Sequence, residues 1–359
     1  MKLLTIAGTR PQLVKVASVS RELRKHFTEV LVNTGQHYDY NMAGVFFEQL
    51  HIPKPDYDLG VGSMPHGRQT GNMMIKVEEV VEKVKPDAIV VYGDTNSTLA
   101  GALVGSKLHI PVMHIEAGLR SYNKKMPEEI NRVMTDHISE LLFAPTDLAV
   151  ENLKKESVTT GVHQIGDVMY DAVLYNMSIA EENYSLEKFH LTPKNYILGT
   201  IHRAENTDDI DKMTAIINAF VNLDFKVLLP LHPRTRNKLE AYGLLEKLNA
   251  ASNIIMSEPI SYLEMLLLEK NASAIVTDSG GVQKEAYFAK VPCFTLRDET
   301  EWVETVEIGW NRLVNPLKEN LVDLINSFEE KDYKEELYGD GKAGEKITQL
   351  IKEYLSEKA

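Results

Sequence analysis

The sequence reads NASAIVTDSGGVQKEAYFAKVPCFTLR over residues 271–297, and the order of residue types predicts a strand, a tight turn and a helix. Residues 274–276 form a short apolar run, as in a buried strand. Ser279, Gly280 and Gly281 follow, and the two glycines lack the Cβ atom that keeps a ligand away from the backbone. A strand that turns directly into a helix is the repeating unit of parallel α/β sheets.

The helix expected over residues 282–289 gives this turn a second property. The first N–H groups of a helix have no partner within the helix, and together with the helix dipole they attract phosphate. Glu285 lies about one turn into the helix, where it would accept hydrogen bonds from ribose hydroxyls. The stretch therefore predicts a site for a nucleoside diphosphate, although the same strand, turn and helix also occur as a plain connection.

Length and composition restrict the class of protein. The chain has 359 residues, which is typical of about two domains, and its net charge of −13 offers no basic surplus for nucleic acid. The single cysteine, Cys293, excludes an internal disulfide and a cysteine-based zinc site. No apolar run approaches the ~20 residues that span a bilayer, and the opening MKLLTIAG is too short for a signal peptide. We therefore expect a cytoplasmic protein without membrane or nucleic-acid partners.

Apolar runs alternate with helical periodicity along the whole chain, which is the pattern of parallel sheets covered by helices. The expected strands lie near residues 2–7, 29–34, 88–92, 111–116, 141–144, 163–166, 196–201, 226–231, 253–257, 274–277, 292–296 and 312–314. These two similar sets predict an α/β protein with two doubly wound, Rossmann-like domains that face each other across a cleft. We place the domains at residues 1–166 and 167–340, and a terminal helix at 341–359 that crosses back to the first domain.

Polar side chains follow several of the expected strands, and ligands of open α/β sheets bind at these carboxyl ends. Arg10 comes after the first strand, where a helix mouth would present its guanidinium to phosphate. Lys15 lies about one turn further on and is either a second phosphate contact or a solvated surface lysine. The turn is neither a Walker loop nor a dinucleotide turn, which disfavours a nicotinamide-dependent dehydrogenase.

Carboxylates follow the third and fourth expected strands of the first half. Asp94 follows the third strand, Glu116 follows the fourth, and Glu128 and Glu129 come shortly afterwards. Carboxylates crowded in a cleft repel each other, which raises the pKa of at least one and suits it to proton transfer. The alternative makes Asp94 a helix N-cap and Glu128 a first-turn helix charge.

Three further candidates come from strand ends of the second half. His202 directly follows an apolar strand and neighbours Arg203, so we favour a functional over a structural role. His232 lies at the next strand end, in the basic segment LHPRTR. Tyr262 is in register to hold a flat base, or is a core residue.

Taken together, these segments resemble the non-hydrolysing UDP-N-acetylglucosamine 2-epimerase family. The matching stretches, in chain order, are GTRPQLVK, GDTNST, HIEAGLRS, MPEEINR, GTIHRAEN, LPLHPRTR, TDSGGVQKEA and RDETEW. The resemblance implies a glycosyltransferase-B-like fold, a UDP-sugar held mainly by the second domain, a homodimer, and neither metal nor nicotinamide cofactor.

The resemblance also implies a reaction and a role for most of the candidate residues. Asp94, Glu116, Glu128 and His202 would be catalytic; Arg10, Ser279 and Gly280 would hold the diphosphate and Glu285 the ribose; Lys15, Arg132 and His232 would line the sugar and phosphate region. The implied reaction is anti elimination of UDP to give 2-acetamidoglucal, followed by re-addition of UDP to the opposite face.

Gln12 departs from the glutamate that many members carry at this position. This form resembles the branch that includes UDP-2,3-diacetamido-2,3-dideoxy-glucuronate 2-epimerases, which is the second candidate. A uronate carboxylate would need a basic partner such as Arg234 or Arg236. A glycosyltransferase of the same architecture and a non-catalytic UDP-sugar sensor are further alternatives. The sensor is disfavoured because carboxylates beside the sugar would only weaken binding of an anion.

Overall fold

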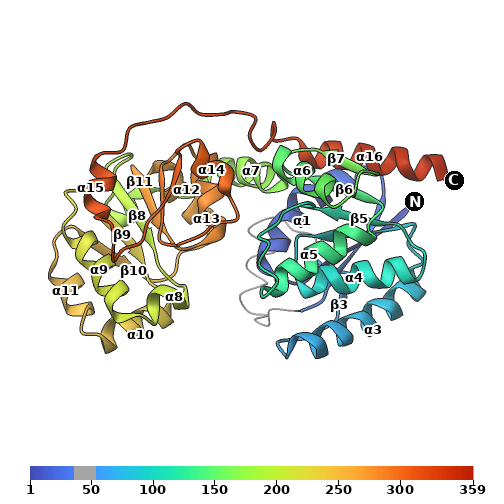
Figure 1. Cartoon of the computed structure of the whole chain (residues 1–359), viewed down its shortest axis with the longest axis horizontal. Helices are drawn as coiled ribbons and strands as arrows, with labels where there is room; N and C mark the ends of the chain where they lie inside the picture. Colours follow the sequence, from blue (N-terminus) through green and yellow to red (C-terminus); the bar gives the residue numbers. More distant parts are fainter. Residues whose placement is uncertain (36–53, 359) are drawn as a thin grey trace. The chain divides into compact units, whose positions relative to one another are not determined.

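A computed structural model describes residues 1–35 and 54–358, except for the side chain of Arg10. The chain divides into two compact units, Met1–Tyr175 with Glu335–Ala359, and Asn176–Lys334. Helix α7 (Val168–Asn183) carries the chain from the first unit into the second (Figure 1). The boundaries between the two units thus lie after Tyr175 and Lys334. The domain boundaries predicted from the sequence lie after residues 166 and 340.

The first unit contains a seven-stranded parallel sheet in the order β3-β2-β1-β4-β5-β6-β7. Its strands are β1 (Lys2–Ala7), β2 (Thr28–Asn33), β3 (Tyr57–Asp58), β4 (Ala88–Tyr92), β5 (Val112–Ile115), β6 (Leu141–Ala144) and β7 (Val162–Gln164). The central strands β4 and β5 are buried along their whole length, without alternation, because helices cover both faces of the sheet. All except β3 were predicted, and β3 is too short to show a sequence period.

Helices cover the first sheet on both sides. They are α1 (Arg10–Leu23), α3 (His66–Val84), α4 (Asn96–Lys107), α5 (Pro127–Ile138), α6 (Asp147–Lys155) and α16 (Ala343–Lys358). Leu4 and Ile6 of β1 pack with α3 and α4 on one face. On the other face, Thr5 of β1 and Ser20 of α1 both donate hydrogen bonds to the buried Glu29, at 2.6 and 2.8 Å. Helix α16 packs against α1, so the end of the chain belongs to the first unit.

The second unit contains a six-stranded parallel sheet in the order β10-β9-β8-β11-β12-β13. Its strands are β8 (Tyr196–Thr200), β9 (Lys226–Pro230), β10 (Ile254–Ser257), β11 (Ala274–Thr277), β12 (Cys293–Thr295) and β13 (Asn311–Leu313). Every one of them lies within a residue of a predicted strand. Cys293 is buried in β12, where burial raises the pKa of its thiol to about 12.

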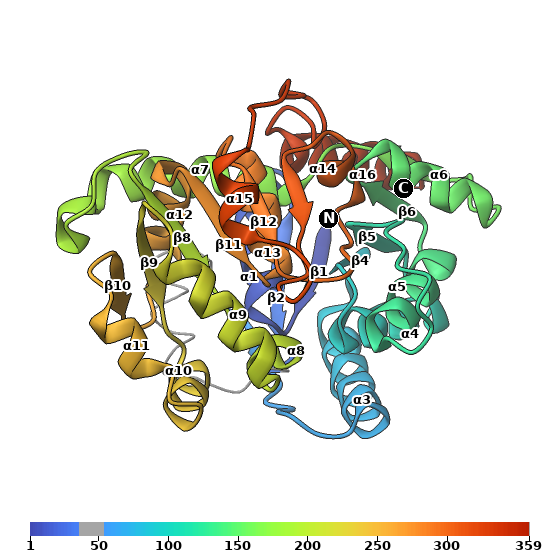
Figure 2. The ribbon, with the colours of Figure 1, turned by 60° about the vertical axis from the view of Figure 1, so that its left-hand side comes forward.

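Two helical layers enclose the second sheet (Figure 2). The helical segments are η1 (Leu186–Phe189), α8 (Ala204–Thr207), α9 (Ile210–Val221), α10 (Pro233–Ala241), α11 (Leu245–Ala250), α12 (Tyr262–Asn271), α13 (Gly280–Phe288), α14 (Val303–Glu307) and α15 (Leu321–Asn326). Ile197 and Val276 pack with α9, α10 and α15 on one face. Their neighbours Leu198 and Ile275 pack with α12 and α13 on the other. Both faces are therefore covered, as in a doubly wound sheet.

Each sheet reverses its strand order once, between β1 and β4 in the first unit and between β8 and β11 in the second. Open α/β sheets bind their ligands at such reversals, outside the carboxyl ends of the strands. The predicted fold class, α/β with two doubly wound sheets, is confirmed. That the two domains face each other across a cleft stays a prediction. Among the described residues, no helix combines the length and the apolar character needed to cross a bilayer.

Candidate functional site

The loops after β1, β4 and β5 lie at the carboxyl edge of the first sheet, beside its reversal. They bring together four of the residues predicted from the sequence: Lys15, Asp94, Glu116 and Arg132. Arg10 opens α1 at the same edge, and its side chain lies outside the described part of the chain.

Glu116 is the most constrained residue at this edge. Its Oε2 forms an ion pair with Nζ of Lys15, and both side chains are largely buried. Its φ of +71° lies in the left-handed region, which costs a residue with a Cβ about 1–3 kcal/mol. The N–H groups of Glu116 and Ala117 both donate to the Phe143 carbonyl at 3.1 Å, which helps to hold this backbone. Such strain is typical of functional sites.

Gly93 has no side chain, which leaves room for the ion pair between Glu116 and Lys15. It follows β4 directly and has a φ of +61°. A Cβ atom at this position would lie 3.2 Å from Oε2 of Glu116 and 3.6 Å from Nζ of Lys15. Glycine therefore suits this position, because its backbone has a positive φ and a side chain would crowd the Glu116 carboxylate.

Asp94 pairs with Arg132 from α5, with 2.5 Å between Oδ2 and Nη2. Loss of surrounding water raises the pKa of the Asp94 carboxyl; Arg132 works against this shift, and Glu116 adds to it. Its side chain nonetheless keeps 30% of its surface exposed. A carboxylate with a raised pKa and an exposed edge is suited to accept a proton near neutral pH. Asp94 is not the N-cap of α4, because Thr95 occupies that position.

The two adjacent glutamates of α5 have different environments. Glu129 is buried and accepts hydrogen bonds from the N–H groups of Ser121 and Tyr122, both at 2.8 Å. It therefore holds the loop before α5. Glu128 is exposed in the first turn of the helix, and its charge contributes to the raised pKa of Asp94. Of the pair, only Glu128 is placed to meet a ligand.

Gln12 ties the loops after β1 and β4 together, a role not predicted from the sequence. Its Oε1 accepts from the N–H groups of Gly8 at 2.9 Å and Thr9 at 3.2 Å. Its Nε2 donates to the Tyr92 carbonyl at 2.7 Å. An amide can do both, whereas an ionised glutamate has no donor for the carbonyl. This explains why glutamine suits the position in this chain.

In the second unit, the predicted residues follow four consecutive strands of the sheet. The order across the sheet is Tyr262 after β10, His232 after β9, His202 after β8 and Ser279 after β11. His232 is exposed, and its Nδ1 accepts the Arg234 N–H at 3.3 Å as the N-cap of α10. Tyr262 is half-buried as the first residue of α12.

The turn between β11 and α13 has the predicted form. Ser279 is the N-cap residue, and the helix begins at Gly280. Trp302 donates from Nε1 to the Gly280 carbonyl at 3.0 Å, which fixes the turn from outside. Gly281 is exposed, and a Cβ atom added there would meet nothing within 4 Å. The start of the helix therefore has open space at Gly281.

Asp278 organises the loop after β8, and sequence reasoning gave it no role. It is fully buried, and its carboxylate accepts from the N–H groups of His202 and Arg203 at 3.0 Å. It also lies 3.0 Å from Nδ1 of His202 and accepts from Nδ2 of Asn206 at 3.1 Å. Burial alone would raise the pKa of Asp278, but these contacts outweigh it and lower the pKa below the ordinary range.

A pair of charged residues lies beside the same turn, and two buried glutamates lie on the helices α12 and α13. Arg297, which follows β12, binds Glu301 with 2.9 Å between Nη1 and Oε2. Burial favours a higher pKa for the Glu301 carboxyl, but Arg297 reverses the effect and the pKa is lowered. Glu285 is only 8% exposed in α13. Burial raises the pKa of Glu269 on α12 well above its usual range, and the charge of Glu285 adds to this shift.

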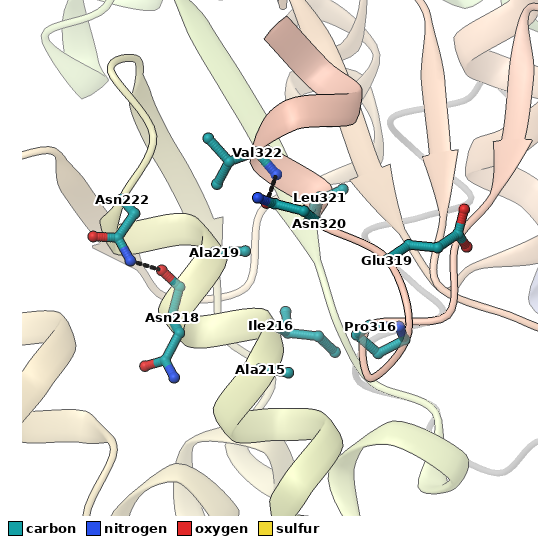
Figure 3. A pocket seen from close by; sticks show the side chains of 10 residues that line it. All are labelled: Ala215, Ile216, Asn218, Ala219, Asn222, Pro316, Glu319, Asn320, Leu321 and Val322. Carbon is teal, nitrogen blue, oxygen red and sulfur yellow. Dashed lines mark hydrogen bonds between the residues drawn. The ribbon is translucent and has the colours of Figure 1, made fainter. Parts of the chain in front are cut away.

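A hollow of about 330 Å³ between α9 and α15 contains none of the predicted site residues (Figure 3). The polar side chains that line this hollow form hydrogen bonds with other groups of the protein. Asn320 caps α15 by accepting the Val322 N–H at 3.1 Å, and Asn222 donates to the Asn218 carbonyl at 2.8 Å. Glu319 accepts from Arg312 and from the Asn315 backbone. This hollow therefore lacks the converging polar groups of a ligand site.

Two doubly wound sheets with polar residues at each strand-order reversal define a nucleotide-binding type of α/β protein. The chain belongs to the UDP-N-acetylglucosamine 2-epimerase family, whose model matches residues 21–352. The family resemblance predicted from the sequence motifs is thus confirmed.

Relatives match the chain over nearly its full length. A UDP-N-acetylglucosamine 2-epimerase homolog of Methanococcus maripaludis is 52% identical over 98% of this chain and 99% of its own. A UDP-2,3-diacetamido-2,3-dideoxy-D-glucuronate 2-epimerase of Pseudomonas aeruginosa is 45% identical over 98% and 99%. The crystal structure of Methanocaldococcus jannaschii UDP-GlcNAc 2-epimerase in complex with UDP-GlcNAc and UDP has a TM-score of 0.85 and 46% identity, covering 98% of this chain and 100% of that one.

Proposed function

We propose that this protein catalyses the reversible 2-epimerisation of UDP-N-acetylglucosamine to UDP-N-acetylmannosamine. The observation that carries the proposal is Glu116, a buried carboxylate in the left-handed region that is paired with Lys15. Glu116 follows β5, and the neighbouring strand β4 leads to Asp94. Two carboxylates in unlike environments can divide the tasks of proton transfer and charge stabilisation. Membership of the epimerase family supports this assignment.

The proposed reaction has two steps. The C2 proton of the sugar is not acidic, so cleavage of the C1–O bond runs ahead and positive charge grows at C1. Asp94, whose pKa is raised, takes the C2 proton as UDP leaves, and the products are 2-acetamidoglucal and UDP. Glu116, which is paired with Lys15, stabilises the positive charge. UDP then adds back to C1, Asp94 releases its proton to water, and a second carboxyl group, assigned to the exposed Glu128, donates a solvent-derived proton to the opposite face of C2.

The second unit would hold the departing UDP. Ser279, Gly280 and Gly281 offer a helix start to the diphosphate, and open space at Gly281 supports this role. His202, held by Asp278 beside that start, would share the diphosphate charge together with Arg10. UDP and the glucal must both stay bound until UDP has added back to C1 and C2 has been protonated on its opposite face, so water has to be excluded during the reaction.

UDP-2,3-diacetamido-2,3-dideoxy-glucuronate is the second candidate substrate, and the Pseudomonas aeruginosa relative supports it. Its carboxylate would need a basic partner. Arg234 is paired with Asp208 at 2.9 Å and Arg236 with Glu258 at 3.3 Å, so both predicted partners already face a carboxylate. This pairing favours the uncharged N-acetylglucosamine as the first choice.

Proton NMR of the protein with UDP-N-acetylglucosamine in D2O tests the proposal. A second anomeric signal together with deuterium at C2 is the expected result. UDP binding without turnover would redirect the assignment to the diacetamido-uronate, which is then tested in the same way. Product formed only after addition of an acceptor sugar would support a glycosyltransferase instead. Failure to bind UDP would overturn the proposed site at Ser279.

We further propose that the protein works as a homodimer in the cytoplasm, an assignment that rests on the family resemblance. Light scattering of the purified full chain measures the assembly, and a mass of about twice 40.5 kDa is expected. A mass of one chain at micromolar concentration would contradict the dimer. Cell fractionation tests the compartment.

A further inference from the structure

His114 lies in the centre of β5 and is fully buried. Its Nδ1 is 2.6 Å from Oδ1 of Asp136, which comes from α5. Its Nε2 is 2.8 Å from the backbone carbonyl of Gly93, at the end of the neighbouring strand β4. The ring thus bridges two elements that carry candidate site residues, and neither contact belongs to the binding or catalytic roles assigned above.

Both partners of the ring are hydrogen-bond acceptors. A backbone carbonyl cannot donate, so Nε2 must carry a proton. Oδ2 of Asp136 accepts from Nη1 of Arg120 at 2.7 Å and from the Gly118 N–H at 3.1 Å. A carboxylate held by a buried arginine remains ionised, so Oδ1 is also an acceptor and Nδ1 must carry a proton as well.

We propose that His114 is an imidazolium in the folded protein and that it positions the two loops that carry Asp94 and Glu116. The charges around it support this state. Arg120 binds Glu156 through two hydrogen bonds of 2.7 and 2.8 Å, in addition to its contact with Asp136. An imidazolium therefore completes a set of two cations and two anions, which leaves the cluster neutral and each buried charge paired. The outermost member is His137, which contacts Glu156 from the surface at 3.0 Å.

The ion pair of His114 and Asp136 contacts both loops at glycines that have a positive φ. His114 binds the carbonyl of Gly93 (φ +61°), the residue before Asp94. Asp136 binds the N–H of Gly118 (φ +83°), two residues after Glu116. A doubly protonated ring is the only state that can donate to both acceptors at once. The imidazolium is thus a positioning residue, and its effect on catalysis rests on the proposed function.

NMR of the full-length protein labelled with ¹⁵N-histidine tests the protonation state without any substrate. Comparison with His114→Gln assigns the ring. The expected result is a proton on both ring nitrogens of His114 at pH 7, with imidazolium nitrogen shifts. In Asp136→Asn, the ring should lose one of these protons at the same pH. A ring that lacks a proton on either nitrogen in the wild type would overturn the inference, whatever the activity.

Kinetics test the positioning role separately. His114→Gln is expected to lower kcat for epimerisation by about 10- to 100-fold, as is common for residues that orient a reactive group. UDP affinity, which depends on the second unit, should change by less than about twofold. His26→Gln, at an exposed histidine, is the matched control. Unchanged kcat in a folded His114→Gln protein would refute the role. If the wild type shows the imidazolium and epimerises neither sugar, the proposed function fails and the protonation state stands.

Discussion

The Asp278 carboxylate accepts a hydrogen bond from the His202 N–H at 3.0 Å and also lies 3.0 Å from the Nδ1 of that histidine. Asp278 follows β11 and His202 follows β8, and these two strands are neighbours where the sheet reverses its order. Because Asp278 is buried whereas the His202 side chain is half exposed, the aspartate fixes the loop and the histidine stays accessible. This arrangement places His202 beside the start of α13.

Replacing Asp278 by asparagine should destabilise the protein in a pH-dependent way. The contacts lower the pKa of this carboxyl in the folded protein, so its stabilising effect is present at neutral pH and is lost as the pH falls through the folded pKa. We expect a loss of about 1–3 kcal/mol in the free energy of unfolding at pH 7. The difference from the wild type should shrink below about pH 4. Urea unfolding at pH 7 and pH 3 measures it, with Asp224→Asn, at an exposed aspartate, as control. A difference that does not vary with pH would refute the explanation.

The raised pKa of Asp94 predicts the acid side of the pH–rate profile. If Asp94 takes the C2 proton it must be ionised, so kcat/KM should fall as the pH drops below this raised pKa. Asp94→Asn should lose about 10²- to 10⁴-fold in kcat and retain UDP binding, because the UDP site is assigned to the second unit. NMR turnover between pH 5 and pH 8 and calorimetric titration with UDP measure these effects. Wild-type turnover in the variant would exclude Asp94 as the base.

The positive φ of Glu116 predicts an unusual order of stability among its variants. Glu116→Ala and Glu116→Gly both remove the ion pair with Lys15, so both should be inactive. Alanine keeps a Cβ atom in the left-handed region and glycine does not, so the glycine variant should be more stable by about 1–2 kcal/mol. Chemical denaturation of the two variants compares them directly. Equal stability, or a more stable alanine variant, would show that the backbone relaxes without strain.

Gly281→Ala should separate folding from ligand binding. A Cβ atom at this position has nothing of the protein within 4 Å, and alanine is favoured over glycine in a helix by roughly 1 kcal/mol. Stability should therefore be unchanged or slightly increased. The added methyl group would enter the space proposed for the diphosphate, so UDP affinity should fall by at least about tenfold, or 1.4 kcal/mol. Thermal unfolding and calorimetry measure the two quantities, and unchanged UDP affinity would place the diphosphate elsewhere.

Local patterns were sufficient to predict most of the fold. The apolar run at residues 88–92 is buried on both faces in β4, because both faces of a parallel sheet are covered. The glycine pair at residues 280 and 281 marked the turn between strand and helix correctly, since β11 ends at Thr277 and α13 begins at Gly280. The two residues of β3 were missed because a period cannot be read from so short a segment.

The sequence by itself determined the alternation of strands and helices, and it placed Asp94, Glu116, His202 and Ser279 after strands. Only the tertiary structure decided what each residue contacts. In the folded protein Glu129 is buried and holds a loop, whereas Glu128 is exposed. His114 contacts Asp136, 22 residues away in the sequence, and His202 contacts Asp278, 76 residues away. The periodicity of apolar residues predicts which face of a strand or helix is buried, because the direction of each side chain depends on local backbone geometry. Partners distant in sequence are chosen only when the strands take their order in the sheet and the loops between them close.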